Sequence, residues 1–281
     1  MSNRKKIILG ILAAQFIVVA FAAGILIYGS EKKAQTVALM NQPQIVVFGD
    51  SIWDNVRDDT GIGAQTAQKL DANVYNLSIA GTGAARIEEL PDVDQTLNHQ
   101  GLYYMVRQAV GLEEAQINPL EEAMQLIDTV DFAQTDYFVI AYGLNDYFNA
   151  VPRVSEDEFD TFTYGGSLRY AISLLQEYYP EAKIVVLSQT YCQGYSYGKV
   201  DSESDTKDYG AGTGPDYVAV AQEVASDMGV IFINNYEDMG INIRNGASYL
   251  SDATHLTAKG RAKYAKILSV RLIQEFREDN Q

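Results

Sequence analysis

Short runs of apolar, largely β-branched residues recur along the chain, and helical patterns separate them. Unbroken apolar runs of this kind are typical of strands buried on both faces of a parallel sheet. They predict five strands, at residues 44–48, 73–77, 137–141, 183–187 and 230–233. Helical spacing predicts six helices, at residues 63–70, 102–110, 120–130, 166–179, 216–228 and 258–276. We therefore expect an α/β domain of three α/β/α layers, with helices on both faces of a doubly wound parallel sheet.

Two connections are longer than one crossover requires. Residues 82–134 hold two of the helical patterns, whereas residues 191–214 are rich in Tyr, Gly, Ser and Asp and match neither strand nor helix. Loops of that length are usually functional or mobile. The tyrosines of residues 191–214 either line a substrate site or lie on an ordinary surface loop, and the sequence leaves both open.

An apolar segment at residues 7–28, interrupted only by Gln15, precedes the α/β pattern. A helix of that length, rising about 1.5 Å per residue, crosses a bilayer core of about 30 Å. The basic tail before it, residues 1–6, favours the cytoplasmic side. We predict a single-pass protein of the cell membrane, with a transmembrane signal anchor at 7–28, a linker at 29–43 and an extracytoplasmic domain at 44–278.

Two other interpretations of the apolar segment are open. A cleaved signal peptide would use the small-x-small site at residues 20–22 and release the domain as a secreted protein. The apolar run continues through Ile27, which favours a retained anchor. A buried core helix is the third interpretation, and the absence of a polar face argues against it.

The formal net charge is −16, and all 37 Asp and Glu residues follow Tyr28. A surface this acidic repels the phosphates of nucleic acids, so we expect no nucleic-acid partner. Cys192 is the single cysteine, so the chain can form no internal disulfide, and no base stands beside it to activate the thiol. No clustered His or Cys residues suggest a metal site, and no Gly-x-x-x-x-Gly-Lys loop suggests a nucleotide, so we expect no cofactor.

Polar residues follow the predicted strands at the edge of the sheet where doubly wound folds bind ligands. Gly49-Asp50-Ser51 comes directly after the first strand, and Ser51 is a candidate nucleophile. Gly81 follows the second strand and Asn145 follows the third. A backbone N–H and a side-chain amide can both donate to a developing oxyanion. Taken singly, each motif also fits a plain turn or a helix cap.

A serine hydroxyl needs a base, and the chain has two histidines, His99 and His255. His99 lies in the polar part of residues 82–134, and we expect it to be exposed to solvent. Asp252 stands three residues before His255, a spacing at which its carboxylate can reach the imidazole Nδ1–H and hold the tautomer. The alternative is that Asp252 closes a turn and Thr257 caps the last helix.

These four motifs, in this order, resemble the SGNH hydrolase superfamily, also called GDSL esterases and lipases. The family is named for a serine, a glycine, an asparagine and a histidine in four blocks, which match Ser51, Gly81, Asn145 and His255. The resemblance spans nearly all of residues 44–276. It implies a flavodoxin-like α/β/α fold, the same three-layer arrangement that the pattern predicts.

The family's roles imply a catalytic triad. Ser51 would be the nucleophile, His255 the general base, and Asp252 the residue that orients the imidazole. Asp50 is expected to shape the turn before Ser51 rather than to react.

The resemblance also implies an oxyanion hole, made of the N–H groups of Ser51 and Gly81 and the side-chain amide of Asn145. The second block departs from the glycine-rich pattern common in the family, and Gly83 is therefore an alternative to Gly81.

A serine esterase acting through an acyl-enzyme intermediate is the activity that the resemblance implies. We expect the substrate to be an ester-bearing small molecule or an acylated carbohydrate, with O-acetyl groups on carbohydrate first and a lipid ester second. An O-acyltransferase acting on cell-surface glycan is a close alternative, because the acyl-enzyme can pass its acyl group to a sugar hydroxyl. A non-catalytic glycan-binding module that retains the fold is the third.

Overall fold

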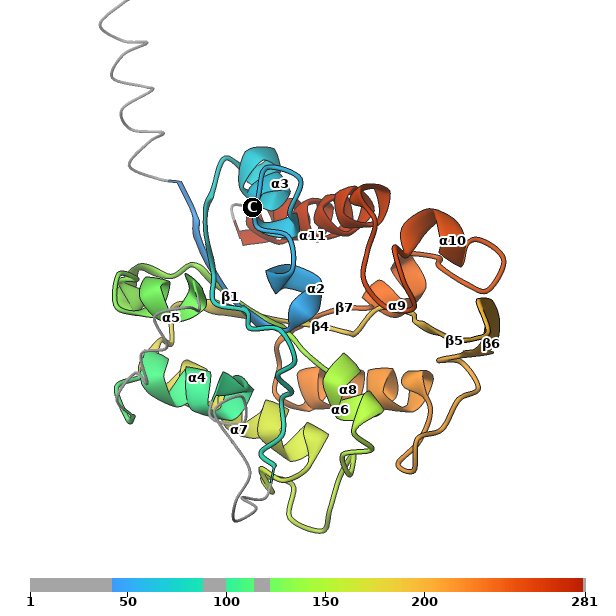
Figure 1. Ribbon diagram of the computed structural model, residues 1–281. Helices are drawn as coiled ribbons and strands as arrows, with labels where there is room; N and C mark the ends of the chain where they lie inside the picture. The colour runs from blue at the N-terminus through green and yellow to red at the C-terminus, as the bar shows by residue number, and fades with distance from the viewer. Residues whose placement is uncertain (1–41, 88–99, 114–121, 280–281) are drawn as a thin grey trace, which may run out of the picture. The chain divides into compact units, whose positions relative to one another are not determined.

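Five strands form one parallel sheet at the centre of the α/β domain (Figure 1). The computed structural model describes residues 42–87, 100–113 and 122–279. The strands are β1 (Gln44–Gly49), β2 (Asn73–Asn76), β3 (Tyr137–Ala141), β4 (Lys183–Leu187) and β7 (Ile231–Ile233). Their order across the sheet is β2-β1-β3-β4-β7, and every neighbouring pair is parallel. All five coincide with predicted strands.

The apolar runs occupy the strands for which burial is greatest. Ile45 to Phe48 of β1 and Phe138 to Ile140 of β3 have no solvent-exposed surface. Burying one such side chain stabilises a fold by about 1.5–3 kcal/mol, so these runs belong at the centre of the sheet. The edge strand β2 is only partly buried, in keeping with its polar ends Asn73 and Asn76.

Helices cover both faces of the sheet. They are α3 (Ile62–Leu70), α4 (Leu102–Ala109), α5 (Glu122–Ile127), α7 (Tyr164–Tyr178), α8 (Gly214–Asp227) and α11 (Ala258–Asp279). In Figure 1, α3 and α11 lie on one side of the sheet, whereas α4, α7 and α8 lie on the other. Each corresponds to a predicted helical pattern, and the prediction of a three-layer α/β/α domain is confirmed.

Residues 191–214 contain a β-hairpin, so the prediction that they form neither strand nor helix is wrong. β5 (Gln193–Ser196) pairs antiparallel with β6 (Lys199–Glu203). The turn residues Tyr197 and Gly198 both have positive φ, 50° and 74°, as a two-residue type I′ turn requires. An Asn-Gly or Asp-Gly pair would have signalled this turn, but a bulky residue such as tyrosine adopts that conformation only rarely.

Five short helices in the described ranges were not predicted, because they are too short to show a helical period. Three follow strands at the carboxyl edge of the sheet: α2 (Ser51–Asp54) after β1, α6 (Leu144–Phe148) after β3 and α9 (Asn235–Asp238) after β7. The other two are α10 (Gly246–Tyr249), which follows α9, and η2 (Phe132–Gln134), which lies before β3. The strand order places the topological switch point between β1 and β3, where flavodoxin-like sheets bind ligands. α2 begins at the end of β1 and α6 at the end of β3, so both helices border that point.

Within the described ranges, no helix combines the length and apolar character that a bilayer crossing demands. The predicted anchor at 7–28 and the basic tail at 1–6 lie outside those ranges, as does His99. The anchor, the linker and the expected exposure of His99 therefore stay predictions.

Candidate active site

Ser51 is the first residue of α2 and is half-buried at the carboxyl end of β1. The turn before it leaves no room for a side chain at Gly49, where a Cβ would lie 2.7 Å from Ser78 Oγ. Asp50 caps the helix, because its Oδ1 accepts the N–H of Ile52 at 2.9 Å. The expectation that Asp50 shapes this turn is confirmed.

Asp252 and His255 lie in a tight turn just before α11. Asp252 Oδ1 accepts the backbone N–H groups of Thr254 and His255, both at 2.7 Å. Its other oxygen, Oδ2, lies 2.8 Å from His255 Nδ1. Thr257 Oγ1 accepts the N–H of Gly260 and so caps α11. Both interpretations of this segment hold together, because one oxygen of Asp252 closes the turn while the other faces the imidazole.

The hydrogen bonds around Asp252 favour its ionised form. Partial burial opposes ionisation, but the donors from His255 and Thr254 outweigh it and hold the pKa of Asp252 below its ordinary value. A carboxylate at Nδ1 selects the tautomer of neutral His255 that carries its proton on Nδ1. Nε2 is then the nitrogen with a free lone pair.

His255 Nε2 lies 3.0 Å from Ser51 Oγ, which is hydrogen-bond distance. The structure therefore brings Ser51, His255 and Asp252 together in one hydrogen-bonded series. Two buried aromatic residues fix the helices on either side of it: Trp53 Nε1 donates to Tyr264 OH at 3.1 Å, and the two rings pack edge to face. This contact joins α2, which carries Ser51, to α11, which follows His255.

An open groove of about 460 Å³ runs along this series. Ser51, Asp252 and His255 line it together with Ile52, Asn55, Val56, Ser251, Leu256, Thr257, Ala258 and Arg261. A volume of this size is in the range of small-molecule sites in proteins. The groove gives a substrate access to the hydroxyl of Ser51 from the side of His255.

Gly81 lies in the loop that follows β2, next to the turn that carries Ser51. The Ile79 N–H donates to the Gly49 carbonyl at 3.0 Å, so the β1–β2 pairing continues to this point. Ser51 comes two residues after Gly49, and Gly81 comes two residues after Ile79. Gly81 has φ of +82°, a conformation that side chains disfavour. No described residue accepts the N–H of Gly81 or that of Ser51.

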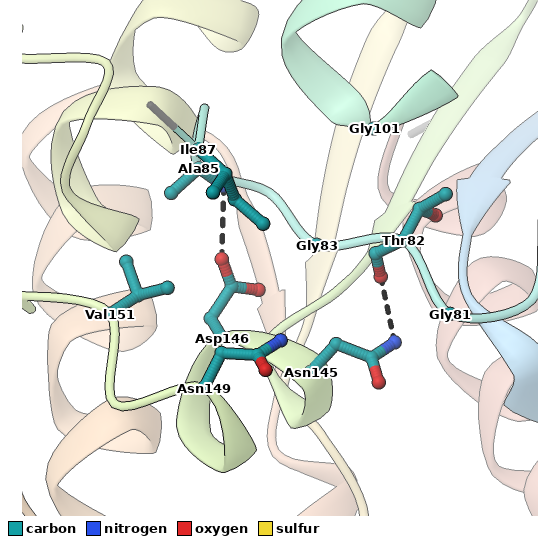
Figure 2. Close-up of a pocket in the computed structure, with 10 residues that line it drawn as sticks. All are labelled: Gly81, Thr82, Gly83, Ala85, Ile87, Gly101, Asn145, Asp146, Asn149 and Val151. Atoms are coloured by element: carbon teal, nitrogen blue, oxygen red, sulfur yellow. Dashed lines mark hydrogen bonds between the residues drawn. The ribbon is translucent and has the colours of Figure 1, made fainter. Parts of the chain in front are cut away.

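Asn145 stands in the first turn of α6, after β3. Its Nδ2 donates to the Thr82 carbonyl at 2.8 Å, and Figure 2 shows the amide pointing toward that oxygen. An amide nitrogen carries two hydrogens, so one stays available to another acceptor. Gly81 and Asn145 both line a small cavity of about 20 Å³, separate from the groove at His255. Its other lining residues are Thr82, Gly83, Ala85, Ile87, Gly101, Asp146, Asn149 and Val151.

Gly83, the alternative to Gly81, faces a carboxyl group. A Cβ at Gly83 would lie 3.0 Å from Asp146 Oδ1. The same Asp146 side chain accepts the N–H groups of Ala84 and Ala85 at 2.9–3.0 Å. A developing negative charge is poorly placed beside a carboxyl group, so this geometry favours Gly81.

Asp50 and Asp146 are both buried beneath the site. Burial raises the pKa of Asp50 to about 7, and the nearby Asp146 adds to the shift. Burial also raises the pKa of Asp146, although hydrogen bonds from Ala85 and Ala84 act in the opposite direction. The carboxyl of Asp50 supports the turn that carries Ser51, and that of Asp146 supports the loop after β2.

Sequence reasoning missed three residues that hold the loop after β2. Asp146 of α6 forms hydrogen bonds to backbone groups of this loop, and so do Asp54 and Arg57 on the α2 side. The sequence carries a signal for Asp146 in its place directly after Asn145. Asp54 and Arg57 lie a helical turn apart, which is common for surface ion pairs and carries no functional signal.

Cys192 is buried, and burial raises the pKa of its thiol to about 12. A thiol with so high a pKa is a poor nucleophile at neutral pH. In the ranges that the structure covers, no three His, Cys, Asp or Glu side chains are grouped so that they could hold a metal ion.

Comparison with known proteins identifies the family and similar folds. A model of the GDSL-like Lipase/Acylhydrolase family matches residues 47–263. A protein from Lactobacillus plantarum has a similar structure, with a TM-score of 0.60 and 20% identity over 83% of this chain and 97% of that chain. A carbohydrate acetylesterase from Sinorhizobium meliloti has a TM-score of 0.54 and 13% identity over 83% of this chain and 99% of that chain. An acetyl xylan esterase has a TM-score of 0.52 and 16% identity over 80% of this chain and 97% of that chain. Comparison with curated proteins finds no significant match.

Proposed function

The chain belongs to the GDSL-like lipase/acylhydrolase family of carboxylic ester hydrolases, and we propose that Ser51, His255 and Asp252 form its catalytic triad. The observation that supports this most directly is the 3.0 Å separation of His255 Nε2 and Ser51 Oγ. A general base must lie within hydrogen-bond reach of the proton that it removes. Asp252, ionised and 2.8 Å from Nδ1, would stabilise the imidazolium that forms.

The proposed reaction begins when Ser51 Oγ attacks the ester carbonyl carbon and His255 Nε2 takes the hydroxyl proton. The carbonyl electron pair moves to oxygen and a tetrahedral oxyanion forms. As that intermediate collapses, the carbon–oxygen bond to the alcohol breaks, and His255 gives its proton to the departing alcohol. Water then attacks the acyl-enzyme with His255 again as base, which releases the carboxylic acid and restores Ser51. Acid–base assistance of this kind contributes about 10²–10⁴ in rate.

Three donors would stabilise the oxyanion: the N–H groups of Ser51 and Gly81 and the second amide hydrogen of Asn145. The two backbone donors have no other acceptor among the described residues. The Thr82 carbonyl holds the Asn145 amide in place through its first hydrogen. Fixed donors need no reorganisation during the reaction, and losing one typically costs about 10²–10³ in rate.

The two cavities suggest an ester with a small acyl group and a large alcohol. His255 must protonate the leaving alcohol, so the alcohol lies in the groove of about 460 Å³. The acyl group then lies on the side of Gly81 and Asn145, beside the cavity of about 20 Å³. That volume holds about one water-sized group, which suits the methyl of an acetyl ester. We propose an O-acetylated carbohydrate as substrate, and the two acetylesterases of similar fold act on substrates of this kind.

We also propose, from the sequence alone, that residues 7–28 anchor the protein in the cell membrane with the domain at 44–278 outside the cytoplasm. Protease added to intact cells should then digest the domain. Protection of the domain from protease in intact cells, with digestion after lysis, would contradict this topology.

Turnover by the purified protein tests the proposed activity. We expect release of p-nitrophenol from p-nitrophenyl acetate and of free acetate from acetylated xylan, together with covalent labelling by a fluorophosphonate. An added unacetylated polysaccharide separates hydrolysis from acyl transfer, because a hydrolase leaves the acceptor unmodified. Absence of both turnover and labelling would contradict an enzymatic role and favour the glycan-binding alternative.

A further inference from the structure

One ion pair ties the helix that carries Ser51 to the loop that carries Gly81. Asp54 is the last residue of α2. Its Oδ1 accepts from Arg57 Nε at 2.8 Å and lies 2.8 Å from Arg57 Nη2 in the ion pair. Its second oxygen, Oδ2, accepts the backbone N–H of Ala80 at 2.7 Å. The carboxylate therefore contacts the residue immediately before Gly81.

Arg57 contacts the same loop at two further points. Its Nη1 donates to the Asn76 carbonyl at 2.9 Å, and its Nη2 donates to the Ser78 carbonyl at 2.7 Å. Only 16% of each side chain of the Asp54–Arg57 pair is exposed. A guanidinium suits this arrangement because its donors form a rigid planar fork. The pair thus forms hydrogen bonds with three backbone groups of residues 76–80.

The consequence for catalysis lies in the next peptide. The Ala80 N–H held by Asp54 belongs to the Ile79–Ala80 peptide, and only the two backbone dihedrals of Ala80 separate that peptide from the Ala80–Gly81 peptide, which carries the Gly81 N–H. The φ of +82° at Gly81 then sets how the chain continues. We propose that Asp54 and Arg57 are positioning residues that align the Gly81 N–H with the Ser51 N–H in the oxyanion hole. This inference rests on the proposed function, because it concerns the donors assigned there.

A purely structural role for the pair would predict that its loss weakens the fold. We expect the fold to be retained instead, because the loop has a second attachment. Asn145 holds the Thr82 carbonyl, and Asp146 holds the N–H groups of Ala84 and Ala85. Loss of the Asp54–Arg57 pair therefore leaves the loop attached to α6 while Gly81 loses its alignment with α2. The rate should fall although the fold is retained.

The test compares Asp54→Ala, Asp54→Asn, Arg57→Gln and Arg57→Lys with the unaltered protein. We expect kcat for p-nitrophenyl acetate to fall about 10- to 100-fold while KM stays within about threefold, since misplacing a catalytic group by about 1 Å can cost 10² in rate. Phenylboronic acid forms a tetrahedral adduct with a reactive serine, and its Ki should rise by a similar factor. The kcat of the double variant Asp54→Ala/Arg57→Gln should be no lower than that of the less active single variant, because both changes break the same ion pair.

A matched control is the ion pair of Arg169 and Asp227, which joins α7 to α8 at 2.6 Å. Arg169→Gln should leave kcat and the boronate Ki unchanged. Wild-type kcat in the Asp54 and Arg57 variants would overturn the inference, as would equal weakening of boronate binding in Arg169→Gln. If Asp54→Ala fails to fold, Asp54→Asn and Arg57→Lys carry the same comparison. Lack of activity in the unaltered protein would instead refute the proposed function itself.

Discussion

His255 Nε2 and Ser51 Oγ lie 3.0 Å apart although 204 positions separate the two residues in the sequence. Ser51 follows the first strand of the sheet, whereas His255 lies in the turn before the last helix. The packing of α11 against α3 closes this distance, and the contact between Trp53 and Tyr264 reinforces it. The proposed active site therefore depends on the folding of the whole domain.

Asp252→Asn should lower kcat for p-nitrophenyl acetate by about 10²–10⁴-fold, because an amide at this position can stabilise the wrong imidazole tautomer. KM should change little. Steady-state kinetics measure both constants. Asp208→Asn is a suitable control, because Asp208 also closes a turn by accepting two backbone N–H groups, those of Gly210 and Gly212. Equal losses in the two variants would mean that Asp252 acts only through its turn.

Asp50 should make the domain less stable as the pH rises from about 4 to about 7. Burial raises the pKa of Asp50 from 3.8 to about 7 in the folded state. Between those values the unfolded chain has lost the proton and the folded chain keeps it, so stability falls by up to about 1.4 kcal/mol per pH unit.

Asp50→Asn removes this titration, and the amide oxygen can still cap α2. Urea unfolding at pH 5 and pH 7.5 measures the effect. The stability of the variant relative to the unaltered protein should rise by about 2–3 kcal/mol between the two pH values. Asp146 is present in both proteins, so the comparison isolates Asp50 together with its interaction with Asp146. A relative stability that does not change with pH would contradict the raised pKa.

Tyr264→Phe should lower the free energy of unfolding by about 1–3 kcal/mol, because it leaves the buried Trp53 N–H without an acceptor. The change removes only the hydroxyl, so the edge-to-face packing of the two rings is retained. Urea denaturation followed by tryptophan fluorescence measures it, since Trp53 is the single tryptophan. Unchanged stability would mean that water or another group satisfies the indole N–H.

Acyl chain length should matter strongly. We expect kcat/KM for p-nitrophenyl acetate to exceed that for the butyrate ester by at least about tenfold, since one methylene in a tight pocket is worth about 1–3 kcal/mol. Val151→Ala enlarges the small cavity beside Asn145 and should narrow the ratio. Val154→Ala, at a valine that is 63% exposed, should leave it unchanged. Equal rates for both esters in the unaltered protein would contradict an acetyl preference.

Much of the fold was predictable because the central strands carry unbroken apolar runs. β1, β3 and β4 are buried on both faces, and their sequences reflect it. The hairpin β5–β6 was missed because its strands are polar and its Tyr197-Gly198 turn lacks the usual asparagine or aspartate. Short helices such as α2 and α6 contain too few residues to show a helical period.

The candidate site divides in the same way. Ser51, Gly81, Asn145 and His255 stand in motifs that are contiguous in sequence, so the sequence is enough to propose them. The hydrogen bonds from Asp54 and Arg57 to the loop after β2 could not be proposed in this way, because they join side chains to backbone groups about 20 positions away. Backbone carbonyl and N–H groups carry no residue-type signal, so contacts of this kind are visible only in three dimensions.

The most direct test of the account is Ser51→Ala. We expect kcat for p-nitrophenyl acetate to fall by on the order of 10⁴-fold or more and fluorophosphonate labelling to disappear, with the urea midpoint essentially unchanged because Ser51 is only half-buried. His255→Ala should reduce turnover to a similar degree. A folded Ser51→Ala variant that retains turnover and labelling would contradict the assignment of Ser51 as nucleophile, and with it the mechanism proposed for this chain.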